Sequence, residues 1–289
     1  GNATCNVGIV DNGRETFIFD SFLSPHPAEE LIKGIEDSDL SPIKYVINSH
    51  YHNDHIRGNQ AFGEDVTIIS TSKTRELIEK WEPINIAEEK GYAPARFEYF
   101  DSLYQNFSGN THSKEYRDLL MWRPYFETLA KSHQEIQTRL PDTFVDSTMT
   151  FEGPDRNIQL ITIGGGHTES DLVMYLPDDQ ILFAADLIFS ECHPYLADGS
   201  IRGSLEWLDY LDKLTIKTIL PGHGQIGTKA LIADMRNYIL TVDKIANGLN
   251  PENNLDNQLE DILIPEEYSD YWFDLFFYSN LRFASKAKN

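Results

Sequence analysis

The sequence is poor in cysteine, in basic residues and in long apolar runs, and each shortage excludes a class of protein. Its 289 residues include two cysteines, Cys5 and Cys192, which are too few for a disulfide framework. No apolar run reaches the roughly 20 residues that a membrane-spanning helix needs, so membrane insertion is not expected. Lysine and arginine number 24 against 46 acidic residues, giving a net charge of −22. Because phosphate backbones attract clustered basic side chains, nucleic acid is not expected as a partner.

The length and the composition fit one large domain over residues 1–289. A chain of this size can bury a sizeable core, and a hydrophobic fraction of 40% is ordinary for a globular protein. The chain begins at Gly1 without a methionine. An export signal that had been removed would therefore leave no trace, so cytoplasmic and exported locations both stay open.

Three imidazoles and one carboxylate fall within six residues, in the run His50-Tyr-His52-Asn-Asp54-His55. A loop can turn all of them toward a common point, and neutral imidazole with carboxylate is the ligand set that suits zinc and related divalent metals. The preceding residues 44–49 have the composition of a buried strand, so the loop would follow the end of a strand, where functional residues of α/β scaffolds are often found. The alternative is a histidine-rich surface turn without function.

Three further apolar runs end in a histidine or a carboxylate. Residues 161–163 lead through three glycines to His167, residues 181–185 lead to Asp186, and residues 218–221 lead to Gly222 and His223. Glycine lets a backbone turn sharply and approach another group closely. A single such residue is more often structural, but repeated strand ends with the same chemistry indicate one site.

The remaining pattern predicts strands interspersed with helices. An Asp-Asn-Gly turn at residues 11–13 predicts a hairpin between two strands, at 5–10 and 15–20. The other expected strands cover residues 44–49, 66–70, 148–151, 157–163, 171–176, 180–185 and 218–220. The expected helices cover residues 28–37, 72–82, 204–214 and 228–247. This order is typical of two sheets that carry helices on their outer faces.

With these motifs, the chain resembles the metallo-β-lactamase-fold hydrolase superfamily from about residue 6 to residue 224. The HxHxDH motif is intact, the later His, Asp and His follow in the family's order, and residues 166–186 look like the family's middle hairpin. The resemblance implies an α+β protein, a four-layer αββα sandwich, here with a helical insertion.

The resemblance also implies two divalent metal ions. His50, His52 and His167 would hold the first ion, and Asp54, His55 and His223 the second, with Asp186 bridging both. The commonest zinc β-lactamases carry cysteine at the bridging position, whereas Asp186 is similar to the bridge of glyoxalase II and lactonases. Zinc is the expected metal, with iron and manganese as alternatives.

The implied activity is hydrolysis of a small-molecule ester, lactone, thioester or amide by a hydroxide that bridges the two metal ions. Asp54 would be both a ligand and a catalytic proton acceptor. Asp20 and Thr168 would orient the ligands. For Asp171, a hydrogen bond within the hairpin and a solvent-facing position at a strand start are equal alternatives.

Three other functions stay open at this point. β-Lactamase activity proper is one, although Asp186 stands where the main β-lactamases have cysteine. A mononuclear iron enzyme of persulfide or redox chemistry is another, but it would not need His55 and His223. A non-catalytic metal-binding scaffold is the third, and the complete ligand set argues against it.

Residues 83–141 would form an insertion longer than the compact members of the family carry. Apolar residues recur there at helical spacing, and Pro124 is expected to kink or divide the helix. The insertion would be either a cap over the metal site or a helix that merely packs on the sandwich.

Two more segments have expected roles. Residues 251–289 form an aromatic, helical C-terminal extension whose rings would cover one face of a sheet or helix, with a homodimer contact as the alternative. His193 and Tyr195 follow Asp186 closely and are candidate substrate-binding residues, Tyr195 as a donor to a developing oxyanion. A plain loop rich in turn residues is the alternative for this segment.

Overall fold

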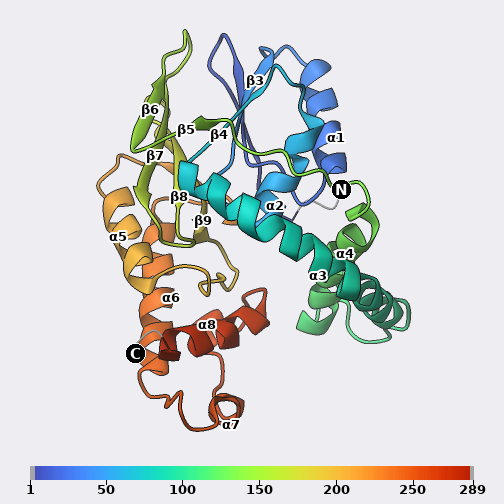
Figure 1. Cartoon of the computed structure of the whole chain (residues 1–289). Helices are drawn as coiled ribbons and strands as arrows, with labels where there is room; N and C mark the ends of the chain where they lie inside the picture. The colour runs from blue at the N-terminus through green and yellow to red at the C-terminus, as the bar shows by residue number, and fades with distance from the viewer. Residues whose placement is uncertain (1–3, 287–289) are drawn as a thin grey trace. The chain divides into compact units, whose positions relative to one another are not determined.

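The computed structural model describes residues 4–286, which divide into two compact units (Figure 1). The first unit comprises residues 1–146 with 151–157, and the second comprises residues 147–150 with 158–289. Each unit has one five-stranded sheet with its own helices. Within residues 4–286, no helix is both long enough and apolar enough to cross a bilayer.

The sheet of the first unit has the strand order β1-β2-β3-β4-β5. These strands are β1 (Gly8–Asp11), β2 (Thr16–Phe19), β3 (Ile43–Ile47), β4 (Thr67–Ser70) and β5 (Thr143–Phe144). β1 and β2 form the predicted antiparallel hairpin, and the other neighbours pair in parallel. Phe17 and Ile18 are fully buried, as the apolar run of β2 requires.

The helices of the first unit include one that is much longer than predicted. They are α1 (Pro25–Glu36), α2 (Asn53–Ile56), the 3-10 turn η1 (Arg57–Ala61), α3 (Ser72–Gln105) and α4 (Lys114–Ser132). The prediction that a helix would end at residue 82 is wrong, because α3 continues through Pro83 and Pro94. Pro124 likewise lies within α4 and does not divide it.

Contacts along the length of α3 explain why the helix continues through its prolines. Thr71 caps the start by accepting a hydrogen bond from the Thr74 amide at 3.0 Å. Farther along, Arg123 of α4 binds Asp101 at 2.6 Å, and the rings of Phe100 and Phe126 stack 5.3 Å apart. Because both helices belong to one tightly packed pair, tertiary contacts offset the lost hydrogen bonds at the proline positions.

The sheet of the second unit has the strand order β10-β9-β8-β7-β6. These strands are β6 (Thr148–Phe151), β7 (Ile158–Gly164), β8 (Asp171–Leu176), β9 (Ile181–Phe189) and β10 (Thr218–His223). β7, β8 and β9 pair antiparallel, and β10 pairs in parallel with β9. Every residue of β8 is buried, which places this strand in the centre of the core.

The helices of the second unit are α5 (Ile201–Leu211), α6 (Ala230–Ala246), α7 (Leu255–Glu260), the 3-10 turn η2 (Glu266–Tyr268) and α8 (Asp274–Lys286). The aromatic C-terminal segment packs on α6 within this unit. The ring of Tyr238 in α6 lies 5.0 Å from that of Tyr268, and Phe277 of α8 is fully buried. A homodimer contact through this segment stays a prediction.

Candidate metal centre

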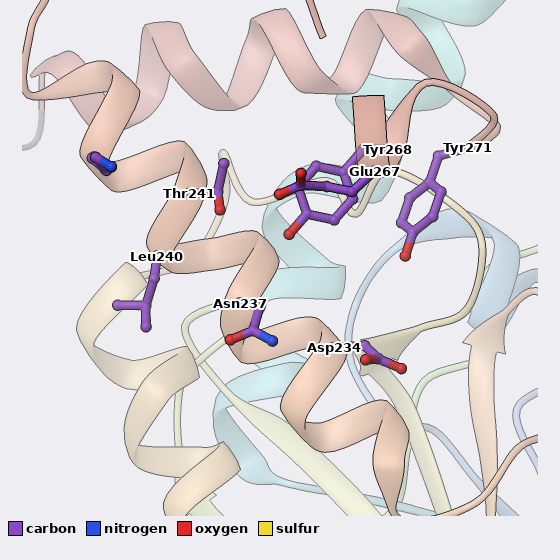
Figure 2. A pocket seen from close by; sticks show the side chains of 8 residues that line it. Asp234, Asn237, Leu240, Thr241, Glu267, Tyr268 and Tyr271 are labelled. Atoms are coloured by element: carbon purple, nitrogen blue, oxygen red, sulfur yellow. The ribbon is translucent and has the colours of Figure 1, made fainter. Parts of the chain in front are cut away.

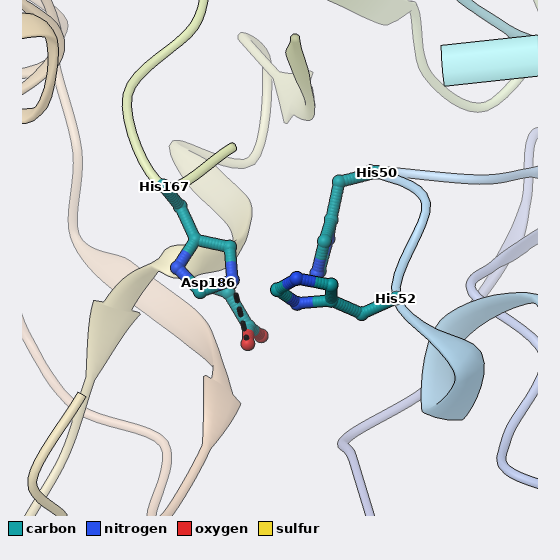
Figure 3. Close-up of side chains that lie close together, drawn as sticks. All are labelled: His50, His52, His167 and Asp186. Atoms are coloured by element: carbon teal, nitrogen blue, oxygen red, sulfur yellow. Dashed lines mark ion pairs between the residues drawn. The ribbon is translucent and has the colours of Figure 1, made fainter. Parts of the chain in front are cut away.

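The four polar residues of the HxHxDH motif lie together just beyond the end of β3. His50 and His52 are in the loop, and Asp54 and His55 are in the one-turn helix α2. The ring centroid of His50 lies 4.6 Å from that of His52 and 4.2 Å from that of His55. Figure 3 shows the imidazoles of His50 and His52 projecting from this loop. The sequence motif therefore forms a compact group of metal-ligand types in the first unit.

Asp20 is hydrogen-bonded to this group and to the residue before it, and ligand orientation by Asp20 stays a prediction. Its Oδ1 accepts a hydrogen bond from the Ser49 amide at 2.8 Å, and its Oδ2 lies 2.8 Å from His55 Nδ1. Burial raises the pKa of the Asp20 carboxyl, while the neighbouring His55 works against that rise. A carboxylate on Nδ1 holds the ring orientation and directs Nε2 as the ligand atom.

Ser49 connects Asp20 to the ring of His50, a contact that the sequence did not predict. Its hydroxyl donates to Asp20 Oδ2 at 2.9 Å and also lies 2.9 Å from His50 Nδ1. One buried carboxylate thus orients His55 directly and His50 through Ser49. Asp20 has a φ of +65°, a left-handed conformation that costs a non-glycine residue free energy and is often found at functional sites.

In the second unit, Asp186 lies between two histidines. Its Oδ2 is 3.4 Å from His167 Nε2 and 3.4 Å from His223 Nε2. Figure 3 marks the pair formed with His167. His167 follows β7 and His223 ends β10, as predicted, whereas Asp186 lies within β9, which continues to Phe189 instead of ending at residue 185. Asp186 is buried, so its charge needs nearby cationic or metal partners.

Glycines next to His223 let the backbone pass close to Asp186. A Cβ atom at Gly222 would lie 1.9 Å from Asp186 Oδ1, so any side chain there would displace the carboxylate. Gly224 has a φ of +89°, and a Cβ atom there would lie 1.8 Å from the Ser190 carbonyl oxygen. Ala185 is also left-handed, with a φ of +46°. The local backbone is therefore shaped around the Asp186 carboxylate.

The family model of the metallo-beta-lactamase superfamily matches residues 1–223, and these include all seven predicted ligands. The chain belongs to the metallo-beta-lactamase superfamily. Members of this superfamily are mostly metal-dependent hydrolases. The histidine and carboxylate donors of this chain fit a metal-dependent hydrolase in general.

Several metallo-beta-lactamases resemble the chain at low identity. Metallo-beta-lactamase type 2 of Bacteroides fragilis is 21% identical over 252 residues, which are 83% of this chain and 76% of that protein. A solved metallo-beta-lactamase of Pontibacter korlensis is 17% identical, with a TM-score of 0.56 over 82% of this chain and 93% of that chain. One of Hirschia baltica is 15% identical, with a TM-score of 0.54 over 81% and 85%. The predicted α+β class and superfamily fold are thereby confirmed.

In this superfamily member, Thr168 and Asp171 stabilise the turn that carries His167. Asp171 accepts hydrogen bonds from the Gly166 amide at 2.7 Å, from the Thr168 amide at 3.1 Å and from the Thr168 hydroxyl at 2.9 Å. Of the two alternatives for Asp171, the hydrogen bond within the hairpin is therefore the one observed. The turn is held on both sides of His167, and ligand orientation by Thr168 stays a prediction.

The candidate substrate residues His193 and Tyr195 contact the C-terminal segment. His193 is fully buried, with Nδ1 2.9 Å from the Tyr238 hydroxyl and Nε2 3.6 Å from Asp274 Oδ1. Burial and the charge of Asp198 raise the pKa of Tyr195 to about 12, so its phenol keeps its proton at neutral pH. A substrate contact stays a prediction for both residues, and His193 also anchors the segment after Asp186 to α6.

A groove of about 540 Å³ lies elsewhere in the second unit, between α6 and the residues around η2 (Figure 2). All but one of the side chains that line it are polar: Asp234, Asn237, Leu240, Thr241, Lys244, Glu267, Tyr268 and Tyr271. Superfamily ligand residues do not contribute to this lining. The groove is formed by α6 and the C-terminal extension rather than by the ligand groups.

Proposed function

We propose that this protein is a binuclear metal-dependent hydrolase that acts on the carbonyl of a small ester, lactone, thioester or amide. The observation that carries the proposal is the complete superfamily donor set, with the ligands of each unit braced by buried carboxylates. The net charge of −22 supports a small molecule rather than nucleic acid as substrate.

The proposed ligands divide into two sites. His50, His52 and His167 hold the first ion, and Asp54, His55 and His223 hold the second, with Asp186 shared by both. The donor types support this division, because each site combines imidazole nitrogens with carboxylate oxygen. Imidazole-rich sites of this kind suit zinc, and Asp54 and Asp186 supply the anionic charge that two dications require.

The side chains contribute binding, orientation and proton transfer. When bound, two divalent ions lower the pKa of a coordinated water and polarise a carbonyl oxygen. Asp54 has an oxygen 3.7 Å from His55 Nε2, so its carboxylate is at the same ligand group and can accept the proton that the attacking water loses. Asp20 and Ser49 keep the rings of His55 and His50 in place during this step.

β-Lactam hydrolysis is a second candidate, favoured by the names of the relatives. The similar proteins from Bacteroides fragilis, Pontibacter korlensis and Hirschia baltica are all called metallo-beta-lactamases. A β-lactam is a cyclic amide, so the same donor set could serve both substrate classes.

Removal of metal is expected to abolish the activity reversibly. The purified chain would be screened on a lactone, a thioester, an aryl ester and a β-lactam, with metal content measured in parallel. About two equivalents of zinc, loss of hydrolysis after dialysis against a chelator and recovery on addition of zinc would support the proposal. One equivalent of iron, or hydrolysis that persists without metal, would contradict the binuclear hydrolase.

The Asp20→Ala variant is expected to bind the second metal ion about 10- to 100-fold more weakly, as is typical when the partner of a ligand histidine is removed. The reason is that His55 loses the carboxylate on Nδ1. Competition with a chromogenic chelator would measure the affinity. Asp39→Ala removes an exposed carboxylate of the same unit and serves as the matched control. If the Asp20→Ala and Asp39→Ala variants bound the second metal ion equally tightly, the proposed role of Asp20 would be contradicted.

A further inference from the structure

Three buried charged residues lie directly behind the metal-ligand loop of the first unit. Arg57, in the turn after α2, places its Nε 2.6 Å from Glu82 Oε1 and its Nη1 2.7 Å from Glu89 Oε2. All three residues are at most 3% exposed. Both glutamates come from α3, and Glu89 lies in the part of this helix that belongs to residues 83–141.

Glu89 contacts both ends of the helical turn that carries two proposed ligands. Its Oε1 accepts a hydrogen bond from Asn53 Nδ2 at 2.9 Å and another from Arg57 Nη2 at 3.0 Å. Asn53 begins α2 and Arg57 follows it, so Asp54 and His55 lie between the two contacts. One carboxylate from α3 therefore contacts this turn at its beginning and at its end.

Neutralisation of Arg57 does not require Glu89. The cluster contains two carboxylates and one guanidinium, and Glu82 alone would form a balanced buried pair with Arg57. Burying a further carboxylate costs free energy, so its presence calls for another reason. Of the two glutamates, only Glu89 is hydrogen-bonded to Asn53, and this contact explains why a second carboxylate is buried here.

Docking of α3 does not depend on Glu89 either. Leu77 and Ile78 of α3 are buried, and Ala93 packs in a cluster with Leu23 and Leu129 of α4. These apolar contacts lie on both sides of Glu89 along the helix. They are expected to keep α3 in place when the carboxylate is replaced.

We propose that Glu89 is a positioning residue, through which the helix α3 sets the affinity of the second metal site. It holds the α2 turn so that Asp54 and His55 present their ligand atoms together. This inference rests on the proposed binuclear function. It extends that function, because the long α3 helix would then position two ligands of the second metal site in addition to packing on the first unit.

The test compares Glu89→Gln with wild type and with Glu88→Gln. Glutamine keeps the length of the side chain but loses the charge that holds Arg57. Glu88 is the exposed neighbour on the same helix, so its variant is the matched control. The readouts are stepwise metal affinity by chelator competition, the absorption spectrum of the cobalt-substituted protein, and the melting temperature of the metal-free chain.

The expected result is selective. Glu89→Gln weakens the second metal ion about 10- to 100-fold and changes the cobalt spectrum of that site. The first ion, the Glu88→Gln variant and the metal-free melting temperature stay close to wild type. Asn53→Ala, which removes one of the two contacts of Glu89, gives a smaller loss in the same direction.

Two results would overturn the inference. Wild-type affinity for both ions in Glu89→Gln would show that the carboxylate does not position the turn. Equal loss of both ions together with a large fall in the metal-free melting temperature would show a purely structural role. The proposed function fails separately, if the wild-type chain itself binds fewer than two ions.

Discussion

Replacing Asp186 with asparagine is expected to lower kcat of the metal-loaded enzyme by about 1,000-fold or more, which corresponds to about 4 kcal/mol of lost transition-state stabilisation. Asp186 Oδ2 lies 3.4 Å from the Nε2 atoms of both His167 and His223, at the centre of the second unit's ligand group. Asparagine keeps the shape but removes the negative charge that the two proposed dications would share. Both metal affinities should therefore fall along with the rate.

The measurement combines steady-state kinetics with metal content after gel filtration. Asp178→Asn is the matched control, because Asp178 is exposed in the turn between β8 and β9, the same hairpin that carries Asp186. This control should retain wild-type kinetics and metal content. Full metal occupancy and near-normal kcat in the Asp186→Asn variant would rule out a bridging role.

Replacing Arg57 with methionine is expected to destabilise the metal-free chain by about 3–5 kcal/mol, the usual cost of leaving a buried charge without its partner. Arg57, Glu82 and Glu89 are all buried, and the guanidinium pairs with both carboxylates. Methionine preserves the apolar stem but leaves two carboxylates facing each other in a poorly solvated site. Urea unfolding of the metal-free chain would measure the loss.

The control for this prediction is Arg202→Met. Arg202 is exposed and pairs with Glu206 one turn away on α5, where solvent screens the interaction. Its free energy of unfolding should match that of wild type within experimental error. A similarly small effect for Arg57→Met would show that the buried triad does not contribute to stability.

The proposed metal ligands could be located in the sequence because their signals are local. The HxHxDH run holds four potential ligands within six consecutive residues. Glycines beside His167 and His223 indicate where the backbone turns. The Asp-Asn-Gly sequence likewise predicted the β1–β2 hairpin, because Asn followed by Gly favours the tight turn that joins two antiparallel strands.

The extent of α3 could not be predicted from the same kind of signal. Pro83 breaks the local pattern, and local rules end a helix near proline. The helix continues because α4 packs along it, with Arg123 binding Asp101, and because Glu82, directly before Pro83, pairs with Arg57, a residue 25 positions earlier. Such contacts exist only once the chain has folded, so the pattern around residue 83 does not reveal them.

The sequence by itself determined the superfamily, the acidic net charge, and the types and order of the proposed metal ligands. Side-chain chemistry, turn residues and charge can be read from short segments without knowing what packs against them. Only the tertiary structure shows that Ser49 links Asp20 to His50 and that Glu89 contacts both ends of the α2 turn. The partner of a buried charge depends on which elements pack against it, and packing joins residues that are distant along the chain.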